Sequence, residues 1–193
     1  MGMIDLEKHF AFYGAYHSNP INIAIHMVFV WPILFTALIL LYFTPSLFSS
    51  PSPLPPPLLL NYGFLFTLIY ALFYASLDFK AGSLAAALTF LCWIGSSFLA
   101  NYLGFSRSWK IVLASQLFCW TGQFIGHGVF EKRAPALFDN LVQAFLMAPF
   151  FVLFEALQLS LGYEPYPGFQ ANVKAKVEAE RKHWHHNKQN KLS

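Results

Sequence analysis

Two histidine-bearing segments lie about a hundred residues apart, and each borders a strongly apolar run. The first reads HSNPINIAIH over 17–26, and the second reads QFIGHGVFE over 123–131. Imidazole and carboxylate groups are costly in hydrocarbon, so within a membrane they usually face partners or water. Three neutral imidazoles suit Fe(II), Zn(II) or Cu(II), and spacing alone does not choose among these ions. We therefore interpret His17, His26 and His127 as ligands of one metal ion near the membrane surface.

Helical spacing gives the first segment a polar face. Three residues follow one another at four-residue steps and would share one side of a helix: His9, Tyr13 and His17. The pair Asn19-Pro20 then resembles an N-cap followed by proline at the first helical position. A new helix starting there places His26 one turn after Asn22, on the same face.

The second segment carries a matching stripe at three- or four-residue steps, made of Trp120, Gln123, His127 and Glu131. Gln123, Asn22 or Glu131 can orient an imidazole ligand through a hydrogen bond, and Glu131 is also a candidate ligand itself. Three nearby glycines remove bulk, so a neighbouring helix or a substrate can approach the backbone closely: Gly122, Gly126 and Gly128.

These segments are positioned by an unusually apolar chain. Hydrophobic residues make up 56% of its 193 residues and charged residues only 11%, whereas an ordinary soluble domain is about 45–50% apolar. We predict an all-α fold, a polytopic membrane helical bundle. Its apolar runs cover 23–43, 57–77, 83–104, 109–126 and 141–162. The first four are expected to span the membrane, which takes about 20 residues each.

The fifth run, 141–162, is expected to cross only in part. Glu155 lies within it and Pro149 interrupts its backbone hydrogen bonding. Basic residues at Lys132, Arg133 and in the tail favour the cytoplasmic side, and a full fifth crossing would separate them. If the first four spans alternate in direction, the start of the first and the end of the fourth emerge on one face, which brings the two histidine segments together.

The remaining segments define the domain organisation. The link 44–57 contains six prolines and no charge, so we expect an extended surface loop. Residues 1–172 would form the membrane-embedded catalytic domain, and 173–193 a basic, histidine-rich tail. The two cysteines have no spacing typical of a disulfide or zinc site. Nothing in the sequence indicates a nucleic-acid partner, and we assign no oligomeric state.

Two blocks resemble the Mpo-type family, the endoplasmic-reticulum 2-hydroxy fatty acid dioxygenases of fungal phytosphingosine degradation. The first block is DLEKHFAFYGAYHSNPINIAIH over 5–26, and the second is GHGVFEKRAPAL over 126–137. The similarity extends over most of the chain, but only these blocks are distinctive. The proline-rich link and the histidine-rich tail match no family feature.

The resemblance implies a multi-pass protein of the endoplasmic reticulum membrane. Such a protein would use Fe(II) and O2 to convert a long-chain 2-hydroxy fatty acid into the acid one carbon shorter and CO2. Iron ligation would fall on His17, His26 and His127, with His9 as a candidate fourth ligand and Glu131 in a supporting role. The candidates for holding the carboxylate or transferring protons are Tyr13, Tyr16, Lys132 and Arg133.

Two other classes stay open at this point. A non-enzymatic lipid-binding or membrane-organising protein needs no metal, because an aromatic-rich bundle with a basic tail binds lipid without one. A di-iron lipid hydroxylase or desaturase would also be histidine-rich and polytopic. Those enzymes use HxxxH and HxxHH boxes, however, and no such box occurs here.

Overall fold

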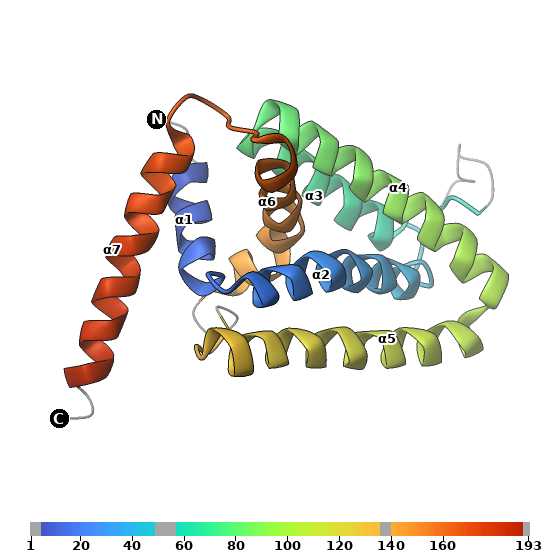
Figure 1. Ribbon diagram of the computed structural model, residues 1–193. Coiled ribbons are helices and arrows are strands. Elements are labelled where there is room, and N and C mark those ends of the chain that lie inside the picture. Colours follow the sequence, from blue (N-terminus) through green and yellow to red (C-terminus); the bar gives the residue numbers. More distant parts are fainter. Residues whose placement is uncertain (1–4, 49–56, 136–139, 191–193) are drawn as a thin grey trace.

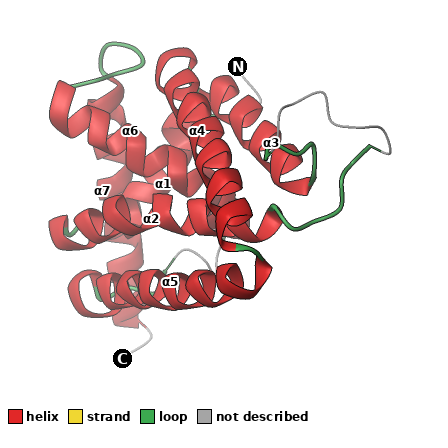
Figure 2. Cartoon of the chain, turned by 90° about the vertical axis from the view of Figure 1, so that its right-hand side faces the viewer, coloured by secondary structure: helices red, strands yellow, loops and turns green. Residues whose placement is uncertain are grey.

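The computed structural model describes residues 5–48, 57–135 and 140–190. Within these ranges the regular secondary structure is helical, apart from an isolated bridge between Ser46 and Asn61, and loops connect the helices (Figure 2). The predicted all-α fold is confirmed. Most of the proline-rich link lies outside the described residues.

Nine helical elements follow one another along the described chain. Seven are α-helices and two are π-helices, η1 and η3: α1 (Leu6–Tyr16), α2 (Pro20–Leu41), α3 (Tyr62–Leu77), α4 (Phe79–Leu103), α5 (Phe105–Ile125), η1 (Gly126–Glu131), η3 (Gln143–Met147), α6 (Ala148–Leu161) and α7 (Phe169–Asn190).

The start of α2 follows from two residues. The Asn19 side chain accepts a hydrogen bond from the Ile21 backbone N–H at 2.9 Å, and Pro20 occupies the first helical position. The cap satisfies an N–H that has no partner within the helix, and proline has no N–H to leave unpaired. The predicted start of this helix is therefore confirmed, and it directs His26 into the bundle.

α2 and α5 run side by side in opposite directions, so the beginning of α2 lies beside the end of α5 (Figure 1). Two features allow the close approach. Gln116 on α5 donates to the Ile33 carbonyl oxygen on α2 at 2.9 Å. A Cβ on Gly122 would lie 2.4 Å from the Phe29 ring, so only glycine fits there without a shift. The expected meeting of the two histidine segments is confirmed.

An aromatic core joins α1, α6 and α7. Its fully or almost fully buried rings belong to Phe10, Phe150, Phe151, Phe154 and Phe169. Phe10 contacts Phe154 edge-on at 4.9 Å between ring centroids, and Phe154 contacts Phe169 at 5.5 Å. α7 therefore begins inside the core before it extends along α1 (Figure 1). The boundary expected at 172/173 falls within this helix.

Three helical segments are long and apolar enough to cross a membrane, namely Pro20–Leu41, Phe79–Leu103 and Gln143–Leu161. Large apolar side chains such as Val28, Leu72 and Leu117 are more than half exposed, as lipid-facing residues are. The chain is a helical membrane protein, as predicted.

Individual spans differ from the prediction. The run at 57–77 yields α3, whose 16 residues are too few for a full crossing. The run at 109–126 belongs to α5, whose apolar character is diluted by Arg107, Lys110 and Gln116. The expectation that 141–162 crosses only in part finds no support in its length and composition, because 19 of its residues qualify as a span. In Figure 1 this segment stands crosswise to α2 and α5.

Candidate metal centre

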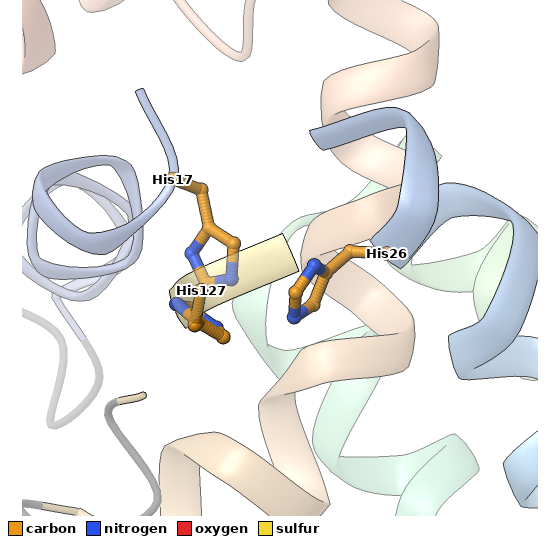
Figure 3. Close-up of side chains that lie close together, drawn as sticks. All are labelled: His17, His26 and His127. Carbon is orange, nitrogen blue, oxygen red and sulfur yellow. The ribbon is translucent and has the colours of Figure 1, made fainter. Parts of the chain in front are cut away.

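Three buried imidazoles meet where α1, α2 and η1 come together. The ring centroids of His17 and His26 lie 4.4 Å apart, those of His26 and His127 4.8 Å, and those of His17 and His127 4.9 Å. The rings turn their nitrogens toward a common point (Figure 3). One nitrogen from each lies within 4.8 Å of the others. This group can hold a metal ion.

Backbone carbonyls fix two of the rings. His17 Nδ1 lies 2.9 Å from the Tyr13 carbonyl oxygen, and His26 Nδ1 lies 2.9 Å from the Asn22 carbonyl oxygen. A carbonyl only accepts, so Nδ1 must carry the proton in each neutral ring. Nε2 is then the unprotonated nitrogen, and its lone pair is available to a metal.

His17 does not continue the helix that precedes it. α1 ends at Tyr16, and His17 follows as its C-cap with φ −132°. The predicted stripe of His9, Tyr13 and His17 is therefore interrupted at its last member. The non-helical backbone turns His17 toward α2, where its Nε2 is buried and has no hydrogen-bond partner.

His127 is presented by the wide turn η1. This π-helix ends where Lys132 adopts the left-handed conformation, with φ 54°, and its N–H returns to the His127 carbonyl. Such short π-helical turns are frequent at functional sites. The Nδ1 atom of His127, like Nε2 of His17, is buried and has no hydrogen-bond partner.

The two imidazoles outside the spans stay neutral well below neutral pH. Burial lowers the pKa of His17 far below its usual value, and the neighbouring His26 and His127 add to this effect. Burial, with smaller contributions from His26 and Arg133, lowers the pKa of His127 to about 3. Neutral imidazole is the form that binds metal, so the pocket favours the protonation state that coordination requires.

Glu131 lies behind the triad and connects its segments. Its carboxylate accepts the backbone N–H groups of Ser18 at 3.0 Å and Asn19 at 2.9 Å, and the Asn22 side-chain amide at 3.2 Å. One carboxylate thus joins η1 to the connection between His17 and α2. Glu131 is not in the group of residues that could hold a metal ion, and its supporting role stays a prediction.

Tyr13 packs directly on the triad. Its ring stacks on His17 at 4.1 Å between centroids, and its hydroxyl donates to Glu155 at 2.8 Å. Burial, together with the nearby Glu155, raises the pKa of Tyr13 well above its usual value, which keeps the phenol protonated. Glu155 is partly buried, and this hydroxyl is its hydrogen-bond partner.

The structure does not bring His9 to the triad. His9 precedes His17 by eight residues, which is about 12 Å along a helix. Its Nδ1 accepts a hydrogen bond from the Gln143 side-chain amide at 2.9 Å. The interpretation of His9 as a fourth ligand is therefore not supported, because its ring serves the contact with η3.

A mostly apolar cavity opens beside the three imidazoles. Tyr13 and Gln123 line it, as expected of candidate catalytic residues, whereas Lys132 and Arg133 do not. Arg133 instead stacks on the Tyr16 ring at 3.6 Å and donates to the Ala15 carbonyl oxygen at 2.7 Å. The rest of the lining is mostly apolar: Trp120, Phe124, Pro135, Ala144, Ala148, Phe151 and Val152.

Gln143 is a polar residue of the cavity lining that the sequence did not lead us to expect. It is buried at the start of η3 and bonds His9. A polar residue near the start of the apolar run 141–162 was the available signal, because uncharged polar groups in such runs are usually placed for a purpose.

The geometry of the triad and its nitrogen donors define a class of protein. Three neutral imidazoles, two of them with buried unpartnered nitrogens, suit a resident metal ion beside an apolar cavity in a helical membrane protein. The described residues contain one such group, whereas a di-iron enzyme needs ligands for two ions.

The chain belongs to the Mpo1-like family. The family described as "2-hydroxy-palmitic acid dioxygenase Mpo1-like" matches residues 3–159. The chain is also 35% identical over 164 residues to "2-hydroxy-palmitic acid dioxygenase MPO1" of Saccharomyces cerevisiae, which covers 85% of this chain and 86% of that relative. The resemblance drawn from the two histidine blocks is confirmed. No solved structure matches the chain.

Proposed function

We propose that this protein is an Fe(II)-dependent dioxygenase of fatty acid α-oxidation. A long-chain 2-hydroxy fatty acid and O2 give the acid one carbon shorter, CO2 and water, with cleavage of the bond between C1 and C2. The observation that carries the proposal is the buried imidazole triad at the wall of a mostly apolar cavity. Family membership and the named activity of the yeast relative support it.

The triad would hold the iron, which supplies electrons to O2 and a binding point for the hydroxyl and carboxylate of the substrate. Tyr13 keeps His17 in place by stacking, and its protonated hydroxyl stays bonded to Glu155. Gln123 offers an amide to the polar end of the substrate from the cavity wall. Trp120, Phe124 and Phe151 exclude water around the reacting carbons.

The apolar lining suits the rest of the substrate. Each buried methylene contributes about 0.8 kcal/mol, so a long alkyl chain favours a site beside hydrocarbon. We place the protein in the endoplasmic reticulum membrane and in sphingolipid catabolism, as its family resemblance implies. The membrane would then supply the substrate directly.

Metal analysis and product analysis test the proposal together. Protein purified in mild detergent is loaded anaerobically with Fe(II), then given 2-hydroxypalmitic acid and O2. We expect about one iron per chain and formation of pentadecanoic acid. Bound iron without product would refute the reaction, and a protein that retains no iron would favour non-enzymatic lipid binding.

Single-residue variants assign the ligands. His17→Ala and His127→Ala should each lose bound iron, because two imidazoles remain where three are needed. His9→Ala is the matched imidazole control and should retain iron, since His9 bonds Gln143 rather than the triad. Loss of iron from all three variants alike would contradict this ligand set.

A further inference from the structure

A second cavity adjoins the one at the triad. Four residues line both cavities: Trp120, Gln123, Ala144 and Ala148. The two cavities therefore lie next to each other along these four residues. The polar groups among the lining side chains of the second cavity are the Gln123 amide, the Tyr70 hydroxyl and the Trp120 indole N–H. The indole N–H donates a hydrogen bond to Gln116 at 2.9 Å.

One face of α2 runs along both cavities. Its lining residues keep to one side of the helix, at His26, Val30, the adjacent pair Ile33 and Leu34, and Ala37. From His26 to Ala37 this face extends about 16 Å at 1.5 Å per residue. An extended chain of single bonds advances about 1.2 Å per bond, since the three backbone bonds of a residue span about 3.5 Å. The face therefore matches about 13 bonds.

The far wall comes from α3 and η3. The Tyr70 hydroxyl donates to the Phe145 carbonyl oxygen at 3.0 Å, and the Tyr74 hydroxyl donates to the Leu146 carbonyl oxygen at 2.9 Å. Two carbonyls of the wide π-helical turn are thus bonded by α3, and the Tyr70 hydroxyl has its partner within the protein. Beyond Gln123, at the wall shared with the first cavity, the lining of the second cavity is mostly apolar, which suits a hydrocarbon.

We infer that the second cavity holds the alkyl chain of the substrate, with the carboxyl end at the triad and Ala37 near the methyl end. The inference rests on the proposed function for the identity of the polar end. It adds that the distance between His26 and the residues around Ala37 determines the length of alkyl chain that the protein accepts.

A steric block at the distal end tests the inference. Ala37→Phe should reduce kcat/KM for 2-hydroxypalmitic acid by at least about tenfold, while 2-hydroxyoctanoic acid is processed within about twofold of the unmodified protein. The matched control is Ala24→Phe, on the exposed side of the same helix, and should leave the chain-length profile unchanged. An equal loss for both acids in an iron-loaded Ala37→Phe protein would overturn the inference.

A photoreactive substrate gives a readout that needs no turnover and no variant. A 2-hydroxy fatty acid with a terminal diazirine should label peptides containing Ile33, Ala37 or Tyr70, and excess 2-hydroxypalmitic acid should suppress the labelling. Labelling there without product formation would retain the chain site and remove the proposed reaction. Product formation with labelling confined to exposed residues such as Val28 would remove the chain site and retain the reaction.

Discussion

His17 and His26 are held by the same local contact. In each case the carbonyl four residues earlier accepts the Nδ1 proton, which selects the tautomer and leaves Nε2 available. Glu131 adds a longer-range contact, because its carboxylate accepts N–H groups from the segment between these histidines. Partners of this kind orient ligand rings, and their loss typically costs 10–100-fold in metal affinity.

Glu131→Gln tests that role. A glutamine has one accepting oxygen, and its NH2 group would face the N–H groups of Ser18 and Asn19. We expect a loss of about 1–3 kcal/mol in the free energy of unfolding and about 10–100-fold weaker iron binding. Chemical denaturation in detergent and competition with a chelator measure the two effects. Glu180→Gln, on the exposed surface of α7, should change neither, and an unaffected Glu131→Gln protein would show that the carboxylate has no supporting role.

At the scale of elements, the site depends on the contact between η1 and the start of α2. A Cβ on Gly126 would lie 2.4 Å from Asn22 Oδ1. Asn22 is fully buried, and its carbonyl oxygen fixes His26. Any movement of Asn22 is therefore transmitted to a triad imidazole.

Gly126→Ala should consequently weaken iron binding, because the added methyl group forces η1 and α2 apart. We expect a loss of at least about tenfold in affinity, together with about 1–3 kcal/mol of stability. Gly128→Ala is the matched control within the same turn, since a Cβ there meets nothing within 4 Å. Iron titration of both variants decides the point, and equal behaviour of the two would contradict the argument.

Helix faces were predictable from the sequence, and departures from α-helical geometry were not. The cap at Asn19-Pro20 and the approach of His26 to His127 followed from residue spacing. His17, however, lies outside its helix, and His127 lies in a π-helical turn. Both features depend on tertiary contacts, such as the hydrogen bonds that the Glu131 carboxylate accepts from Ser18 and Asn19. The same limit explains why His9 was expected at the triad. Regular helical spacing places His9 on one face with His17, but the helix ends at Tyr16.

At the scale of the whole molecule, α7 is part of the bundle rather than an independent tail. Phe169 is fully buried against Phe10 and Phe154. α1, which carries Tyr13 and leads into His17, is therefore held between the core and α7. The stability of the N-terminal half of the site depends on the C-terminal helix.

Phe169→Ala should destabilise the protein by about 3–5 kcal/mol, because it leaves a cavity in the aromatic core. We expect the loss to appear as a lower thermal midpoint and as faster hydrogen exchange in α1 as well as α7. Phe79→Ala removes an exposed ring, 82% accessible, and provides the comparison. Destabilisation confined to α7 would show that α1 is held without it.

Because three separate segments contribute the triad, the order of their synthesis limits when the complete site can form. His17 and His26 are synthesised early, whereas His127 follows about a hundred residues later. A nascent chain that ends before η1 offers two imidazoles, so it has no complete site while α2 is being inserted. A metal ion held by all three imidazoles would therefore have to bind after α5 has docked against α2.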